Sequence, residues 1–232
     1  MRLRPAVLAV ALPLLSLTLA ACGESAVDKY VKTAPATVDR DMRAGLAALK
    51  SVHVHTVQKG TTGTFTIDMS VDNAGRCIGT LSQGSMTLNL IGLSASKVYA
   101  KGSASFWASE GASATQAAAL ADKWVTGLPQ NLFTDACGTQ GIVKSYKTNS
   151  VAQDKPKVLG KTKVGGVDAV RLQITLSGTP VTLAISADNP HRILSVSAPK
   201  AKLTTIYSQF DQPIHPVAPT GAQDINKLAP SK

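Results

Sequence analysis

Apolar and polar residues alternate along most of the chain after residue 50, and this period of two predicts β-strands. In residues 65–71, Phe, Ile, Met and Val share one face while Thr, Asp and Ser share the other, as in a strand with one buried side. The same alternation predicts strands over 52–57, 77–83, 86–90, 97–101, 158–164, 167–176, 179–187, 193–197 and 203–210. Turn sequences such as Asp72-Asn73-Ala74-Gly75 and Gly165-Gly166 join neighbouring strands, so we expect antiparallel pairing.

The segment before the first predicted strand has helical spacing instead. Its apolar residues Val38, Met42 and Leu46 recur every four positions and form one stripe of a helix predicted over 37–50. Thr37 is the expected N-cap, and two aspartates in the first turn favour this N-terminus because negative charge complements the helix dipole.

Helices are also expected between two groups of strands. An Ala-rich run predicts a helix within 107–123, and 132–143 is expected to supply a short helix that carries Cys137. The tail, 213–232, is rich in Pro and Ala and is expected to be irregular. The order helix, strands, helical middle, strands indicates an α+β fold with one domain over 37–212. We expect one large, curved antiparallel sheet with helices covering one face.

The first 22 residues have the features of a bacterial export signal. Arg2 and Arg4 precede an apolar stretch over 6–19, which is shorter than the roughly 20 residues that a membrane-spanning helix needs. Leu19-Ala20-Ala21-Cys22 resembles the bacterial lipobox, in which the thiol receives a diacylglyceryl group and the chain is cut before the cysteine. We therefore expect 1–21 to be a removed signal peptide and Cys22 to be the lipid attachment site. The alternative is an ordinary signal peptide with a chance cysteine.

These features predict a protein anchored by lipid to the outer face of the bacterial cell membrane. Residues 22–36 would then act as a lipidated tether, spanning roughly 20 Å as a flexible coil. The formal net charge is +10, to which Arg2 and Arg4 of the signal peptide contribute. A positive surface is attracted to anionic lipid head groups. Export and the scattered positions of the lysines argue against nucleic acid as a partner.

Two cysteines remain once Cys22 is assigned to lipid. In an oxidising compartment, Cys77 and Cys137 are expected to form a disulfide, which would close a loop of about 60 residues and add about 3–5 kcal/mol. The alternative is a pair of free buried thiols, and a zinc site would need more ligands. His53 and His55 share one face of a strand, but no acidic or cysteine cluster lies nearby in sequence, so we expect no metal site.

The chain also resembles a known group of lipoproteins in the order of its elements. The segments that carry the resemblance are Leu19–Cys22, Leu49–His53, Gly63–Asp72, Lys97–Tyr99, Phe106–Trp107, Lys123–Val125, Lys161–Leu176, Val181–Ile185 and Ile193–Val196. In these it is similar to the actinobacterial lipoproteins related to LppX and LprG, and more broadly to the LolA/LolB/RseB group. The resemblance implies a half-barrel whose concave face, lidded by helices, holds acyl chains. Some members of the group carry lipids or lipoproteins, and others sense envelope stress.

A lipid cavity in such a half-barrel would be lined by apolar side chains of the sheet and by the two tryptophans. The candidate lining residues are Leu88, Leu90, Val98, Trp107, Trp124, Val170, Leu172, Ile174, Leu183 and Ile185. The alternative is that helices pack against the sheet and leave a filled core. For the tryptophans, the alternatives are packing of the helical middle on the sheet, or a position at a cavity mouth or at the membrane interface.

Catalytic motifs such as Gly-x-Ser-x-Gly and His-Glu-x-x-His do not occur in the chain. Gly165-Gly166 is followed by a strand pattern, so it is expected to be a hairpin turn and not a phosphate-binding loop. The sequence therefore predicts a protein without catalytic activity or cofactor that binds or carries a lipid or glycolipid. The alternative is an envelope sensor or chaperone-like module that contacts another membrane protein without bound lipid.

Overall fold

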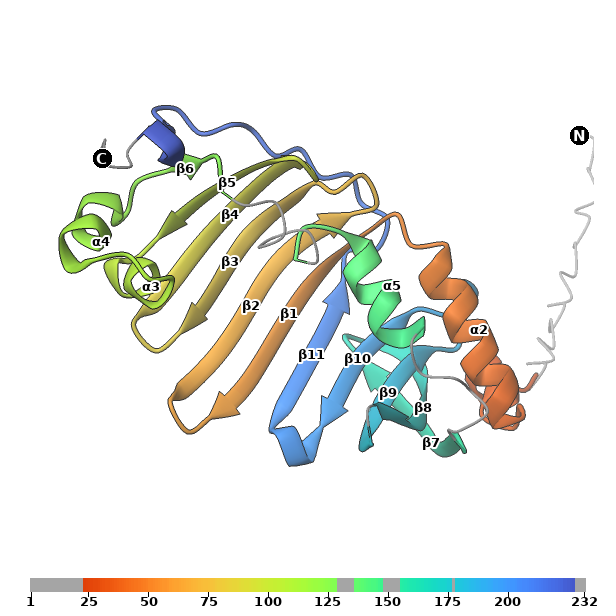
Figure 1. Cartoon of the computed structure of the whole chain (residues 1–232). Coiled ribbons are helices and arrows are strands. Elements are labelled where there is room, and N and C mark those ends of the chain that lie inside the picture. Colours follow the sequence, from red (N-terminus) through yellow and green to blue (C-terminus); the bar gives the residue numbers. More distant parts are fainter. Residues whose placement is uncertain (1–22, 129–135, 148–154, 177, 228–232) are drawn as a thin grey trace, which may run out of the picture.

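The computed structural model of the chain describes residues 23–128, 136–147, 155–176 and 178–227 (Figure 1). In these residues, β1 to β12 form one open, curved sheet in the order β12-β6-β5-β4-β3-β2-β1-β11-β10-β9-β8-β7. The strands are β1 Ser51–Gly60, β2 Gly63–Asp72, β3 Cys77–Gln83, β4 Met86–Ser94, β5 Lys97–Gly102, β6 Val125–Thr126, β7 Lys157–Val164, β8 Val167–Leu176, β9 Thr179–Ser186, β10 Ile193–Ala198, β11 Leu203–Ser208 and β12 Gln223–Asp224.

Two meanders build this sheet. The strands β1 to β5 pair in sequence order, the strands β7 to β11 do the same, and β1 pairs antiparallel with β11 to join the two groups. The turn between β7 and β8 has positive φ angles of 56° at Gly165 and 83° at Gly166, a backbone that glycine adopts readily because it has no Cβ. The predicted antiparallel sheet is confirmed, with small shifts at the strand ends.

The helices lie on one face of the sheet, which we call the inner face (Figure 1). Helices α1, α2 and α5 lie over the half that contains β8 to β10, whereas α3 and α4 lie at the other half, beside β4 and β5. The helices are α1 Ala26–Tyr30, α2 Pro35–Ala47, α3 Ala104–Ser109, α4 Ala114–Leu120 and α5 Thr139–Lys147, and the 3-10 turns are η2 Pro199–Ala201 and η3 Ile225–Lys227. The α+β fold class predicted from the sequence is thus confirmed.

The range 22–36, expected as a flexible tether, contains helix α1 and the first two residues of α2, so these parts are not a flexible coil. Ser25 caps α1 by accepting a hydrogen bond from the Asp28 backbone, and Val27 and Tyr30 of this helix are buried. The next helix, α2, begins at Pro35 and not at Thr37, because proline needs no hydrogen-bond partner for its nitrogen in the first turn. Burial of these two side chains holds the segment on the sheet.

The helical middle also differs from the expectation. The predicted helix within 107–123 is divided into α3 and α4, because Ser103 and Ser113 each begin a separate helix by side-chain capping. Cys137 precedes α5 and is not part of a helix, and the first residues of the predicted helix over 132–143 lie outside the described residues. The tail after residue 213 contains β12, which pairs parallel with β6.

Two large apolar clusters fill the space between sheet and helices. The cluster that we call the α2 core consists of Val27, Tyr30, Val38, Met42, Leu46, Tyr146, Val170, Leu172, Ile174, Val181, Leu183, Ile185, Ala187, Ile193, Val196 and Ala198. The cluster that we call the α3 core consists of Leu49, Val52, Met69, Val71, Cys77, Leu88, Leu90, Ala100, Trp107, Ala117, Val125 and Cys137. Each half of the sheet therefore has its own core.

Candidate functional site

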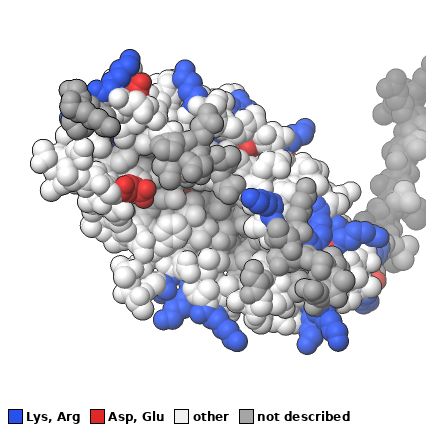
Figure 2. Space-filling view, viewed as in Figure 1, with Lys and Arg blue, Asp and Glu red and all other residues white. Residues whose placement is uncertain are grey.

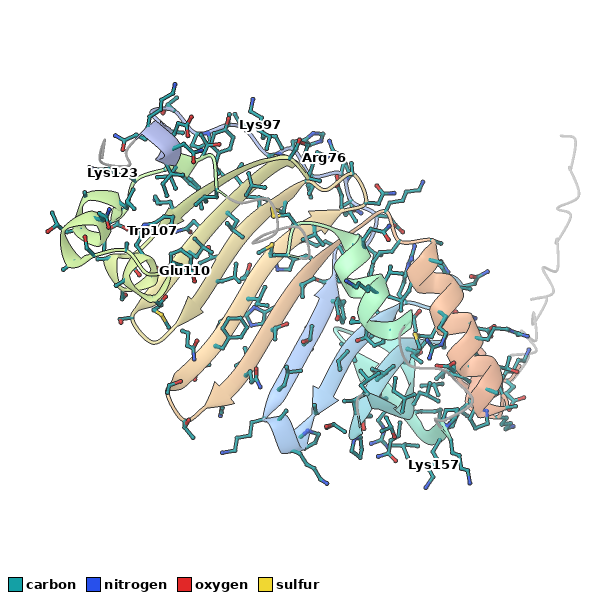
Figure 3. The ribbon with its side chains drawn as sticks, viewed as in Figure 1. Arg76, Lys97, Trp107, Glu110, Lys123 and Lys157 are labelled. Atoms are coloured by element: carbon teal, nitrogen blue, oxygen red, sulfur yellow. A yellow bond between two sulfur atoms is a disulfide. The ribbon has the colours of Figure 1, made fainter. Side chains whose placement is uncertain are left out.

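Helix α3 packs on the sheet where glycine lets it approach closely. A Cβ at Gly102 would lie 2.5 Å from Cδ1 of Phe106 and 3.1 Å from ring atoms of Trp107. The two aromatic rings meet edge to face, with centroids 5.0 Å apart. The missing Cβ of Gly102 on β5 thus leaves room for both rings of α3 to lie close to the sheet (Figure 3 labels Trp107).

A groove of about 200 Å³ lies on the inner face between α3 and the strands β2, β3 and β4. We call this the inner groove. Its apolar lining comes from Phe65, Leu81, Met86, Leu88 and Phe106, and its polar lining comes from Ser82, Gln83, Thr87, Ser109 and Glu110. Strand alternation produces the apolar part of this surface, because Leu81, Met86 and Leu88 point to the same face of β3 and β4.

The groove is open to solvent, and most of its apolar side chains are incompletely covered. Leu88 is buried at 5% exposure, whereas Phe65, Leu81, Met86 and Phe106 are half-buried. Glu110 follows α3 and supplies the carboxylate at the groove. Figure 2 shows that the middle of the inner face is mostly uncharged, with Lys and Arg gathered around its rim. A half-exposed apolar surface of this kind gains free energy when an apolar partner covers it.

The other half of the inner face is filled by its helices. The candidate residues Val170, Leu172, Ile174, Leu183 and Ile185 all lie in the α2 core, with exposures from 0% to 3%. Beneath α2, the free space bordered by Leu46, Ile193 and Phe210 is only about 10 Å³, close to the volume that one water needs. These five candidates are therefore placed in a packed core, and none of them lines the inner groove.

The remaining candidates are divided between the groove and its surroundings. Leu88 lines the inner groove, and Leu90, Val98 and Trp107 belong to or pack against the α3 core behind it. Trp107 is 4% exposed, so it packs α3 on the sheet. Trp124 precedes β6, and the Lys101 ammonium lies 5.4 Å from its ring centroid, within cation–π distance. Trp124 does not line the groove.

Of the lining residues, the sequence singled out only Leu88 as a cavity candidate; the others are Phe65, Leu81, Ser82, Gln83, Met86, Thr87, Phe106, Ser109 and Glu110. Alternation already assigned Phe65 and Met86 to the apolar face of their strands. Which part of that face stays open depends on where α3 and α2 lie, and this is a property of the tertiary structure.

Tyr207 lies at the boundary between the two cores and packs against both of them. Its hydroxyl is within hydrogen-bonding reach of Tyr146 of α5, and burial raises the pKa of both phenols. Both hydroxyls therefore stay neutral at physiological pH, so this contact between α5 and the sheet carries no charge.

The predicted disulfide is present and links β3 to the segment before α5. Cys77 of β3 and Cys137 before α5 have an S–S distance of 2.06 Å and a Cα–Cα distance of 5.0 Å. A Cβ at Gly92 would lie 2.9 Å from Sγ of Cys77, so the bridge packs directly on β4. The disulfide thus fixes the start of α5 to the inner face beside the α3 core.

His53 and His55 lie on the outer face of β1 and contact one carboxylate on β2. His55 Nδ1 is 3.0 Å from Oδ2 of Asp68, His53 Nε2 is 3.5 Å from Oδ1, and His53 Nδ1 is 3.1 Å from Oγ of Ser70. The imidazole nitrogens of both histidines thus contact the Asp68 carboxylate, and His53 also contacts the Ser70 hydroxyl. Within the described part of the chain, no group of three His, Cys, Asp or Glu side chains is arranged to hold a metal ion.

Comparisons with known proteins identify the fold. No family model and no curated protein matches the sequence. Among solved structures, LprF from Mycobacterium bovis matches with a TM-score of 0.54 and 16% identity over 80% of this chain and 96% of that chain. The lipoprotein LppX from Mycobacterium tuberculosis matches with a TM-score of 0.49 and 17% identity over 80% of this chain and 100% of that chain. The chain therefore has the fold of LprF, a large open and mostly antiparallel sheet with helices on one face, in agreement with the expected fold. In the described residues, no helix is long and apolar enough to cross a membrane.

Proposed function

We propose that this chain is a lipoprotein, anchored through Cys22 to the outer face of the bacterial cell membrane, that binds an acyl lipid in the inner groove and has no catalytic role. The observation that carries the proposal is the asymmetry of the inner face. Helices fill the α2 half, whereas half-buried Phe65, Leu81 and Met86 stay open beside α3. Such a surface suits an apolar ligand that covers it on binding.

The composition of the inner groove supports an acyl chain with a polar head. Each methylene that the apolar lining removes from water contributes about 0.8 kcal/mol. The polar side chains of Gln83, Ser109 and Glu110 supply hydrogen-bonding partners for a head group. The groove volume of about 200 Å³ is below the range of roughly 300–1,000 Å³ that is usual for small-molecule pockets, which favours one acyl chain over two.

The direct test is mass spectrometry of the lipid that the protein carries. Residues 23–232 would be exported from an actinobacterial host, purified without detergent and extracted with organic solvent. We expect one defined lipid at about one copy per protein, because a single groove of this size offers one site. An extract without a stoichiometric lipid would contradict the proposal.

A matched pair of variants on β3 tests whether the inner groove is the binding site. Leu81→Glu places a carboxylate in the groove, whereas Ile78→Glu places one on the outer face, where Ile78 is 44% exposed. We expect Leu81→Glu to purify without lipid and Ile78→Glu to keep it, because an acyl chain does not compensate a buried charge. Circular dichroism would establish that both variants are folded. Equal lipid content in the two variants would locate the lipid elsewhere.

The anchor is tested separately by Cys22→Ala. Without a thiol, no lipid can be attached, so we expect an unprocessed precursor that still carries residues 1–21. Immunoblotting of membrane and soluble fractions, together with the mass of the purified chain, gives the readout. Normal cleavage of the variant would show that an ordinary signal peptidase processes this chain.

A further inference from the structure

The N-terminal segment of the described chain is fixed to one end of the sheet. Helix α1 contacts β8, and its residues Val27 and Tyr30 are buried in the α2 core. The carboxylate of Asp28 accepts a hydrogen bond from the Lys161 ammonium of β7. Lys32 and Glu24 form an ion pair across the same helix. These contacts hold the chain in place from Glu24 onward.

This attachment determines where an acylated Cys22 would enter the membrane. Cys22 is two residues before Glu24, so their Cα atoms are at most about 7 Å apart, whatever the conformation between them. A lipid on Cys22 would therefore insert next to α1 and β7. The described residues offer no length of free chain that would lift this end of the domain away from the head groups.

The surface around this point is rich in cations. Its exposed Lys and Arg side chains are Lys29, Lys32, Lys155, Lys157, Lys161, Lys163 and Arg171. They outnumber the neighbouring carboxylates of Glu24, Asp28 and Asp168, which pair with Lys32, Lys161 and Lys163. Figure 3 shows Lys157 reaching away from the ribbon at this end of the molecule, far from Lys97 and Lys123 at the other end.

Two large apolar side chains are exposed on the same hairpin. Leu159 of β7 is 41% exposed and Val167 of β8 is 43% exposed. Strand β7 is an edge of the sheet, and its row of lysines disfavours pairing with a strand of another protein. The register places Lys163 and Val167 on opposite faces of the hairpin, so the cations and the exposed apolar side chains meet only around the edge of the sheet. Such an edge suits the interface of a membrane, where charge meets lipid head groups and apolar groups meet the acyl boundary.

We propose that the surface formed by α1 and the β7–β8 hairpin docks on an anionic membrane surface. The inference rests on the proposed acylation of Cys22, which would hold this surface at the head groups. We call it the α1–β7 surface and define it by Lys29, Lys157, Leu159, Lys163 and Val167. Because the inner groove lies over β2 to β4 in the other half of the sheet, docking at α1 and β7 leaves the groove in the half that is not anchored.

Lysine footprinting on vesicles tests this docking directly. Residues 22–232 would be coupled through the Cys22 thiol to a maleimide lipid, either in phosphatidylcholine vesicles or in vesicles that also contain phosphatidylglycerol. Acetylation of each lysine would then be followed by mass spectrometry. We expect Lys29, Lys157 and Lys163 to react about fivefold more slowly on the anionic vesicles, with Lys97 and Lys123 unchanged. Equal rates on the two kinds of vesicle would overturn the proposal.

Two charge-reversal variants separate a local surface from the overall charge of the protein. Lys29→Glu/Lys157→Glu and Lys97→Glu/Lys123→Glu change the net charge equally, but at opposite ends of the molecule. We expect the first pair to abolish the protection of Lys163 and the second pair to preserve it. The same loss in both variants would overturn the proposal, since protection would then follow net charge alone.

The footprinting experiment can fail while the proposed function holds, and the reverse is also true. Chemical coupling replaces acylation in the cell, and the footprint does not depend on a lipid in the inner groove. A protein that is not acylated in the cell would still give the expected footprint, whereas an acylated lipid carrier that does not dock would not. Protection of Lys29 and Lys157 by an acidic protein, but not by anionic vesicles, would assign the surface to that protein and overturn the proposal.

Discussion

Arg192 joins three segments that are far apart in the sequence. Its buried guanidinium donates one hydrogen bond to the carbonyl of Gly45 in α2, and its Nη2 is 2.6 Å from Oδ2 of Asp211. Asp211 also accepts a hydrogen bond from the backbone of Lys50. A buried cation needs such partners, because its desolvation is costly when no opposite charge or acceptor lies nearby.

Removal of the charge at Asp211 should therefore destabilise the fold. Asp211 has a φ of 58°, which asparagine tolerates well, so Asp211→Asn removes the charge without adding backbone strain. We expect a loss of about 2 kcal/mol in the free energy of unfolding, measured by urea denaturation. Asp188→Asn in the exposed turn before β10 is the control and should change stability by less than about 0.5 kcal/mol. Equal effects would show that the Arg192 contact contributes little.

Tyr30 differs from Arg192, because its buried hydroxyl has no hydrogen bond within the described part of the chain to offset the loss of water. Its ring stacks on His191 with centroids 4.2 Å apart and an angle of 8°, while its hydroxyl has no hydrogen-bond partner among the described residues. Burial also raises the pKa of this phenol well above its ordinary value.

Tyr30→Phe should consequently preserve or increase stability. The substitution keeps the stacked ring and removes a desolvated hydroxyl, so we expect a change between zero and about +1 kcal/mol in a thermal melt. Tyr30→Ala should instead lose about 3–5 kcal/mol, because it leaves a cavity in the α2 core. A clear loss in Tyr30→Phe would indicate that the hydroxyl has a partner, such as a bound water.

The ion pair between Lys161 and Asp28 makes the docking of α1 sensitive to acid only at very low pH. The hydrogen bond from Lys161 lowers the pKa of Asp28 from 3.8 to about 2. Because the folded pKa is depressed, the contribution of this carboxylate is present above pH 3.8 and is lost as the pH falls toward 2. An NMR titration of the Asp28 carboxyl carbon should give this low midpoint. Lys161→Met should return the midpoint toward 3.8, and an unchanged midpoint would contradict the pairing.

At the scale of the elements, the disulfide ties the helical middle to the sheet. It connects residues that are separated by 60 positions, and it fixes the segment before α5 to β3. The strands β3 and β4 below it carry several residues of the inner groove, so the bridge also stabilises the side of the sheet that we assign to lipid binding.

Loss of this disulfide should destabilise the folded protein. We expect Cys77→Ser/Cys137→Ser to lower the free energy of unfolding by about 3–5 kcal/mol, because the unfolded chain gains the entropy that the closed loop had removed. Differential scanning calorimetry of the oxidised protein gives the comparison. All variants would be compared as residues 22–232, and in this chain Cys22→Ser is the matched control that should leave the melting temperature unchanged. A small effect in the double variant would mean that the local packing holds the loop without the bridge.

For the whole molecule, stability and ligand binding should separate between the two halves of the sheet. Leu172 is fully buried in the α2 core, so Leu172→Ala should lose about 3 kcal/mol and keep the bound lipid. Leu81 is half-buried in the groove, so Leu81→Ala should lose about 1 kcal/mol and reduce the lipid content. Denaturant titration and lipid extraction of the same preparations provide both measurements. Parallel losses of lipid in the two variants would contradict this division.

The sequence by itself determined the strands β1 to β5 and β7 to β11, their antiparallel pairing within each meander, and the disulfide partners, but not the short strands β6 and β12 or their parallel pairing. A period of two in residues such as 65–71 needs one buried face, and short turns permit only antiparallel neighbours. Once Cys22 is assigned to lipid, the remaining two of the three cysteines allow one bridge. The sequence also showed that Leu88 and Leu172 are inward-facing residues of strands, but it could not separate their roles. Both are leucines on the apolar side of an alternating pattern, and that pattern reports the face of a strand without reporting what covers it.

Only the tertiary structure decided which part of the inner face is filled. Helix α2 and the unexpected helix α1 lie over β8 to β10 and exclude open space there, whereas Gly102 holds α3 beside β4 and leaves the inner groove. The burial of Val27 and Tyr30 likewise converts an apparent tether into a docked helix. In each case, the outcome depends on contacts between residues that are far apart in the chain. The local pattern of apolar and polar residues does not specify those contacts.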